Sequence, residues 1–310
     1  MVDRALLRAV TVPDVASTLQ MALEHWDDVV PRLEKMYTAL NNGRIVESFP
    51  LDISALAAPL PRAYQWLDGS AYLSHVERVR QARGAEMPPN YLTDPLMYQG
   101  RSDRFLGPRD PILIGNEDQG ADFEAEIAVI TDDVPQGVTA EEASGHIQLL
   151  FLVNDVSLRN LIPAELAKGF GFLHGKPGCA FSPVAVTMNE FGPAWNAGKV
   201  QLRLRIHRNG ELFGSPDAGQ GMHFNFPSLI SHAAKTRDLA AGTIVGSGTV
   251  SNADSSRGYA CIVERRMVEI LETGAATTPY LRFGERVRIE MLDDEGQSIL
   301  GAIEQEVVRC

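Results

Sequence analysis

Two short apolar stretches decide the fold: DFEAEIAVI at residues 122–130 and LLFLVND at residues 149–155. They carry Glu124, Glu126 and Asp155. Acids and apolar residues alternate in the first stretch, so a strand would place both glutamates on one face. Neighbouring carboxylates repel or raise one another's pKa unless a cation lies between them, and oxygen ligands select Mg²⁺, Ca²⁺ or Mn²⁺. An isolated pair of this kind more often lies on a solvated strand face. The third acid, where a second apolar run ends, favours a metal site.

The first part of the chain is predicted to be helical and the second mostly β. Apolar residues at steps of three and four run from residue 15 to residue 40, and a turn at residue 66 leads into a helix that stops near residue 84. Shorter helices are expected around residues 163–168 and 226–237. An Asn209-Gly210 pair predicts a hairpin. Strands are expected at residues 124–130, 147–153, 182–188, 199–213, 242–250, 265–271 and 286–292. A boundary near residues 55–60 would separate a small N-terminal domain, 1–58, from a β-rich body, 59–310.

Composition limits the function classes. The 310 residues are 45% hydrophobic and 22% charged, without an apolar run long enough to cross a membrane. The formal net charge of −12 and the scattered basic residues argue against nucleic-acid binding. The first residues resemble no secretory signal, so a cytoplasmic location is expected. Cys179, Cys261 and Cys310 are widely spaced, as reduced thiols would be.

Six further residues could carry chemistry, and each has an ordinary structural explanation when taken alone. Arg159 follows Asp155 by four residues and could simply pair with it, and Glu264 could form a salt bridge at a strand end. The six are His75, Tyr98, Arg159, Lys176, Thr249 and Glu264.

Taken together, the segments FEAEIAVI, NDVSLRN, GK and GTIVGSGTV resemble the fumarylacetoacetate hydrolase family over roughly residues 60 to 305. The resemblance implies an α+β fold whose β-rich C-terminal domain is a mixed β-sandwich or β-roll with few helices, preceded by a small N-terminal region. It also implies that Glu124, Glu126 and Asp155 ligate Mg²⁺ or Ca²⁺, with Mn²⁺ as a further candidate, and that Lys176 is the active-site lysine.

The resemblance extends to residues upstream. It implies Asp68 as a further metal ligand, His75 as the group that activates water, and Glu264 as the residue that orients this histidine. Tyr98, Thr249 and Arg83 would bind substrate.

Three positions depart from the family pattern, and substrate recognition could therefore differ. Asn160 stands where aspartate is usual, Ile162 where glutamine is usual, and Pro177 where serine is common.

The expected reaction is metal-assisted hydrolysis of a carbon-carbon bond in a β-diketo acid such as fumarylacetoacetate, with His75 as general base and Lys176 and Arg159 stabilising the oxyanion. The alternatives are acylpyruvate hydrolysis, oxaloacetate decarboxylation, isomerisation of a hydroxydienedioate, and metal binding without catalysis. The partner is expected to be a small keto acid, with neither nucleic acid nor membrane, and the resemblance implies a homodimer.

Overall fold

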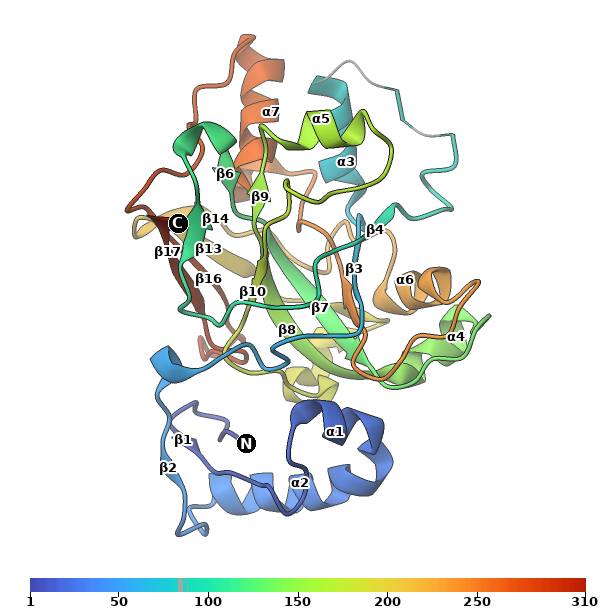
Figure 1. Ribbon diagram of the computed structural model, residues 1–310, viewed down its shortest axis with the longest axis vertical. Helices are drawn as coiled ribbons and strands as arrows, with labels where there is room; N and C mark the ends of the chain where they lie inside the picture. The colour runs from blue at the N-terminus through green and yellow to red at the C-terminus, as the bar shows by residue number, and fades with distance from the viewer. Residues whose placement is uncertain (83–85, 88) are drawn as a thin grey trace.

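The computed structural model describes residues 1–82, 86–87 and 89–310. Arg83, expected to bind substrate, therefore lies outside the described residues. Figure 1 shows the N-terminal segments at one end of the molecule and a β-rich body above them, with α3, α5 and α7 gathered at the opposite end. The α+β, β-rich class predicted from the sequence is confirmed.

Two larger sheets form the body within the described residues. The first has the order β10 (Cys179–Phe181), β8 (Ile147–Asp155), β7 (Ala125–Thr131), β15 (Ile244–Gly246), β3 (Trp66–Gly69) and β4 (Met97–Gln99). The second has the order β14 (Glu211–Gly214), β13 (Leu204–Arg208), β16 (Arg286–Met291), β17 (Ile303–Arg309) and β5 (Ile112–Ile114). Both sheets are mostly antiparallel, with parallel pairs at β15 and β3 and at β17 and β5. Three short pairs complete the strands: β1 (Arg8–Ala9) with β2 (Phe49–Pro50), β6 (Ala121–Asp122) with β9 (Ser157–Leu158), and β11 (Trp195–Asn196) with β12 (Lys199–Val200).

Seven α-helices accompany the sheets in the described part of the chain. They are α1 (Leu19–Glu24), α2 (Trp26–Asn41), α3 (Leu73–Ala82), α4 (Ala140–Ala143), α5 (Ile162–Leu166), α6 (Phe226–Ala233) and α7 (Ile262–Thr273). The predicted N-terminal helical region is confirmed, divided at His25.

The strands β7 and β8 are buried on both faces, which explains their nearly continuous apolar sequence. Side chains of β7 alternate between two core clusters, with Ile127 and Val129 in one and Ala128 and Ile130 in the other. Glu126 shares the face of Ala128 and is fully buried. The solvated-face explanation for the paired glutamates is therefore wrong.

The hairpin predicted at Asn209-Gly210 is confirmed and joins β13 to β14. The φ angles of these two residues are 53° and 85°. A two-residue turn of this kind requires positive φ at both positions, which Asn and Gly tolerate best.

Two predicted strands are wrong. Residues 265–271 lie in α7, because Asp122 accepts the N–H groups of Ile262 and Val263 at the helix start and Gly274 ends the helix with φ 85°. Residues 182–188 form only an isolated bridge at Val186, followed by a 3₁₀ turn. The turn expected at residue 66 is instead the strand β3, and β4, β5 and β17 were not predicted.

Candidate active site

Three strands of the six-stranded sheet bring Asp68, Glu126 and Asp155 to one place. Asp68 lies on β3, Glu126 on β7 and Asp155 at the end of β8. Each lies two residues from a member of the second core cluster, so all three point to the same face of the sheet. Carboxylate oxygens of the three residues lie within 4.8 Å of one another. We call these three residues the acid group.

Strand β15 lies between β3 and β7 and makes this convergence possible through Gly246. Its neighbours in register are Asp68 and Ala128. A Cβ atom at Gly246 would lie 2.4 Å from Oδ1 of Asp68 and 2.4 Å from the Trp66 ring. No side chain larger than hydrogen fits between these strands as they stand.

The acid group is buried, and its carboxylates raise one another's pKa. Asp68 is 4% exposed, and Glu126 and Asp155 are 0% exposed. In the described part of the chain, neither carboxylate oxygen of Glu126 has a hydrogen-bond partner. Burial, together with the charge of Asp155, raises the pKa of Asp68 well above its usual range. Burial and the charges of Asp68 and Asp155 likewise raise the pKa of Glu126. Neighbouring buried carboxylates raise one another's pKa in this way, and a cation placed between them would favour their ionised forms.

Glu124 differs from the acid group because two basic side chains bind it. The Nζ atom of Lys176 donates to Oε2 of Glu124 at 2.8 Å and to Oδ2 of Asp155 at 2.5 Å. Arg159 donates to Oδ2 of Asp122 at 2.8 Å and also to Glu124. Although burial raises it, the pKa of Glu124 lies below its usual range because of Arg159 and Lys176. The direct pair of Arg159 with Asp155 considered from the sequence is not formed.

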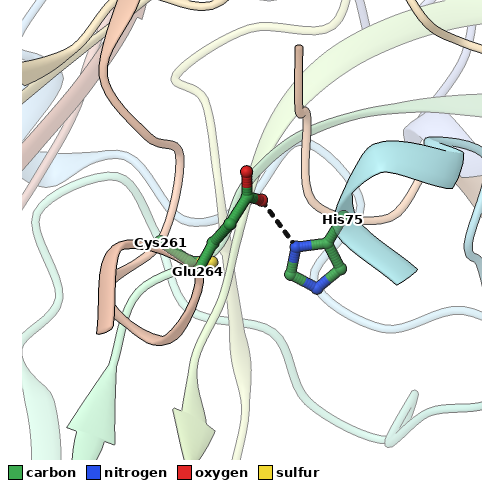
Figure 2. A group of neighbouring side chains, drawn as sticks. All are labelled: His75, Cys261 and Glu264. Carbon is green, nitrogen blue, oxygen red and sulfur yellow. Dashed lines mark hydrogen bonds and ion pairs between the residues drawn. The ribbon is translucent and has the colours of Figure 1, made fainter. Parts of the chain in front are cut away.

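His75 and Glu264 come together from two helices. His75 lies on α3 and Glu264 in the first turn of α7, and Figure 2 shows the imidazole and the carboxylate pointing toward each other. The Nδ1 atom of His75 lies 2.8 Å from Oε2 of Glu264. Burial raises the pKa of Glu264, but the bond to His75 and the charge of Arg78 bring it below its usual range. Because an ionised Glu264 can only accept, the Nδ1–H group of His75 is the donor in this pair.

One cavity of about 170 Å³ reaches both Asp68 of the acid group and His75. Its polar wall includes Asp68, Glu124, His75 and Lys176, and its apolar wall includes Val79, Ile162, Leu166, Phe172 and Val263. Tyr98 and Thr249 also line it, and Tyr98 donates to Oδ2 of Asp155 at 2.5 Å. Apart from Arg83, the structure thus places every predicted substrate-binding residue at this cavity.

The residues present fit a hard divalent cation. The donors are carboxylate oxygens from separate strands, they lie within coordination reach of one position, and Glu126 offers two oxygens without partners. Oxygen donors of this kind suit Mg²⁺ or Ca²⁺. Asp68, Glu126 and Asp155 would hold the ion, with Asp155 sharing its carboxylate with Lys176, Tyr98 and Cys179, whereas Glu124 would have to release Lys176 or Arg159 to join them.

Sequence reasoning missed four residues around the site. Arg78 and Ser251 both donate to Oε1 of Glu264. Cys179 donates through its thiol to Oδ1 of Asp155 at 2.9 Å, as its register opposite that residue in β10 allows. Gly246 is the fourth, and its place in the repeated glycines of GTIVGSGTV was the one available hint.

Comparison with known protein families agrees with this geometry. Residues 65–308 match the model described as fumarylacetoacetate (FAA) hydrolase C-terminal, and residues 1–62 match fumarylacetoacetase N-terminal domain 2. The chain belongs to the fumarylacetoacetate hydrolase family. The resemblance drawn from the sequence is confirmed. Members of this family are enzymes that typically use a divalent metal.

Curated relatives differ in their reactions. The chain is 30% identical over 160 residues to an oxaloacetate tautomerase of Xenopus laevis, covering 50% of this chain and 47% of the relative. It is 27% identical over 160 residues to a 2,4-didehydro-3-deoxy-L-rhamnonate hydrolase of a Sphingomonas species, covering 51% and 53%. Over 204 residues it is 28% identical to an oxaloacetate tautomerase of Bacillus subtilis, covering 63% and 62%. The chain thus spans about half of the first of these relatives.

Solved structures share the fold. A 5-carboxymethyl-2-hydroxymuconate delta-isomerase from Mycobacterium smegmatis superimposes with a TM-score of 0.58 at 21% identity, covering 86% of each chain. A maleylpyruvate hydrolase from Sphingobium superimposes with a TM-score of 0.62 at 15% identity, covering 94% of this chain and 86% of the other. At these identities the likeness establishes architecture alone. Among the described residues, no helix has the length and apolar character needed to span a membrane.

Proposed function

We propose that this protein is a divalent-metal-dependent hydrolase that cleaves a carbon-carbon bond in a β-diketo acid of the fumarylacetoacetate type. The observation that carries the proposal is that His75, held at Nδ1 by Glu264, lines the same cavity as Asp68 of the acid group. Hydrolysis needs a base for water as well as a site that polarises a carbonyl group, and this cavity offers residues for both.

The chain's own residues can perform the proton transfers. Nε2 of His75 would take a proton from water while the water oxygen forms a bond to the substrate carbonyl carbon. Glu264 stabilises the imidazolium that results, as a carboxylate partner does. When the carbon-carbon bond breaks, the electron pair goes to the leaving carbon, and the proton held by His75 balances it. A divalent cation at the acid group would supply Lewis acidity at the carbonyl oxygen.

Lys176 would support negative charge on the substrate. Its ammonium group has three N–H donors, of which Glu124 and Asp155 take two, so one remains for a substrate oxygen in the cavity. Although burial lowers it, the pKa of Lys176 lies above its usual range because of Asp155 and Glu124. The lysine is therefore a permanent cation, suited to electrostatic stabilisation and unsuited to proton transfer.

A second candidate is tautomerisation of a short keto acid such as oxaloacetate. The cavity of about 170 Å³ favours it, because ligand pockets usually measure about 300 to 1,000 Å³. The same His75 could move a proton between carbon and oxygen without breaking a carbon-carbon bond.

The experiment is a substrate comparison with purified protein in Mg²⁺, Ca²⁺ or Mn²⁺, with and without EDTA. Fumarylacetoacetate, acylpyruvates and oxaloacetate are followed by absorbance, and products are identified by NMR. Metal-dependent appearance of two carboxylic-acid fragments supports hydrolysis. Enol-to-keto conversion without fragments would replace the first proposal by the second, and pyruvate with CO₂ would indicate decarboxylation. His75→Gln is the matched control, since it removes the base and leaves the acid group intact.

The cytoplasmic location and the homodimer expected from the sequence belong to this proposal. Size-exclusion chromatography with light scattering tests the second.

A further inference from the structure

Arg78 lies one helical turn after His75 on α3 and binds both α7 and the loop that follows Thr249. Its Nη1 atom donates to Oε1 of Glu264 at 2.5 Å and to the carbonyl oxygen of Asn252 at 2.8 Å. Its Nη2 atom donates to the carbonyl oxygen of Ala253 at 2.7 Å. The side chain is 15% exposed, so these contacts are largely shielded from water. Arg78 thus holds three parts of the site together.

The carboxylate of Glu264 is divided between its partners. His75 takes Oε2, whereas Arg78 and the hydroxyl of Ser251, at 2.8 Å, share Oε1. Ser251 in turn lies 2.8 Å from the hydroxyl of Ser74 on α3. The carboxylate therefore cannot rotate toward a second position, and the imidazole that it holds is fixed with it.

This group of side chains differs in charge from the acid group. His75, Glu264 and Cys261 offer donor atoms close enough for a metal, but the charge of Glu264 is already balanced by Arg78. The thiol of Cys261 is fully buried and its pKa is raised well above its usual range, chiefly by burial. Arg78 donates to Glu264, whereas no side chain in the described part of the chain donates to Glu126.

We propose that Arg78 is a positioning residue: its guanidinium charge balances Glu264 and holds the carboxylate whose Oε2 atom orients the imidazole of His75. A carboxylate on Nδ1 draws a proton onto an imidazole, and a cation on the far oxygen weakens that pull. The other ionisable groups that share the cavity with His75 or lie close to it are Asp68, Tyr98, Glu124, Arg159, Lys176 and the thiol of Cys261. Among the described residues, Glu264 is the carboxylate bonded to the imidazole, and Arg78 binds its other oxygen. The role of His75 as base rests on the proposed function, whereas the contacts of Arg78 do not.

The test is the protonation midpoint of His75, measured by ¹H–¹⁵N NMR in the full-length protein without substrate. Removing the charge in Arg78→Gln is expected to raise this midpoint by roughly one pH unit. Arg78→Lys keeps the charge and is expected to leave the midpoint unchanged. Arg80→Gln is the matched control, because Arg80 lies on the same helix and donates to the carbonyl oxygen of Glu86. If Arg78→Gln does not fold, Arg78→Met provides the second neutral variant.

Kinetics provide the second readout. With the substrate found for the wild-type protein, Arg78→Gln is expected to lower kcat by up to about tenfold at low pH, to shift the acidic limb of the kcat profile upward, and to leave KM unchanged. Arg78→Lys should restore both the kcat value and the position of the acidic limb. Equal midpoints in all variants, or equal shifts in Arg78→Lys and Arg78→Gln, would overturn the charge-balancing role. A wild-type protein without turnover would refute the proposed function and leave the NMR test intact.

Discussion

Glu126 offers the sharpest test of the acid group, because its replacement should have opposite effects with and without metal. Both carboxylate oxygens are buried without a hydrogen-bond partner among the described residues, and two other acids lie within 4.8 Å. At a pH above the raised pKa values, where these acids are ionised, the amide nitrogen of Glu126→Gln can donate to Asp68 or Asp155, so a repulsive contact becomes an attractive one. Without metal, the variant should therefore be more stable than the wild type.

The size of this effect follows from the cost of a buried polar group without a partner, about 1 to 3 kcal/mol. A chain of 310 residues that unfolds with an entropy of about 2.1 cal/mol/K per residue gains roughly 2 to 5 °C in Tm from that amount. With Mg²⁺ at one hundred times its Kd, the wild type should gain about 2.7 kcal/mol, or roughly 4 °C. The variant should show little of this second gain.

The assay is calorimetric or fluorimetric unfolding of both proteins in EDTA and in a Mg²⁺ or Ca²⁺ series. Glu285→Gln is the control, since Glu285 pairs at 2.7 Å with Arg208 of the other large sheet. This variant protein should lose the same amount of stability with and without metal. A lower Tm for Glu126→Gln in EDTA would show that the carboxylate is well solvated or paired. An unchanged response to the ion would show that Glu126 is not a ligand. Either result would refute the metal site as described.

Three further outcomes are expected. Burial raises the folded-state pKa values of Asp68 and Glu126 above their unfolded values of about 4. Stability that the metal-free protein has at low pH should therefore be lost as the pH rises through the raised pKa values. The Tm gain from Mg²⁺ should accordingly grow with pH in calorimetric scans. Gly246→Ala should lower the free energy of unfolding by about 1 to 3 kcal/mol and weaken the response of Tm to Mg²⁺. Gly145→Ala, where the added Cβ meets open space, should change neither quantity in the same scans. His75→Ala should keep the metal-induced Tm gain and lose roughly 10² to 10⁴ in kcat; full turnover would exclude it as the base.

Much of the sheet could be predicted from local pattern. The alternating acids of residues 122–130 and the apolar run of residues 149–155 form the central strands, and Asn209-Gly210 turns as its chemistry requires. The strand predicted at residues 265–271 was wrong, because alternation of polar and apolar residues over seven positions is also typical of a strand. The helix there depends on Asp122, which binds the first N–H groups of α7 from 140 and 141 residues away. Local sequence does not contain that contact.

The site was only partly predictable for the same reason. Glu124, Glu126 and Asp155 could be identified because like charges in apolar segments are unusual, and the family resemblance supplied Asp68, His75 and Glu264. Arg78 could not be found from pattern, because it looks like one more solvated arginine on an amphipathic helix and its partner lies 186 residues away in the sequence. The role of Gly246 likewise depends on β15 lying between β3 and β7, an order that the chain sequence does not display.

The charge distribution separates two tasks within one cavity. At the acid group, three carboxylates lie beside one basic side chain, Lys176, a surplus of negative charge that would favour a divalent ion. At Glu264 the charge is matched locally by Arg78, and this carboxylate also holds the imidazole of His75, the proposed base. Relatives named as hydrolases, isomerases and tautomerases share the fold or part of the sequence. Holding a keto acid on an ion is common to such reactions, so the difference between them must arise at the proton-transfer group and at the apolar wall that positions the substrate. Variants of Arg78 and Ile162 therefore address reaction type and substrate choice separately, because the first contacts Glu264 and the second lines the opposite wall.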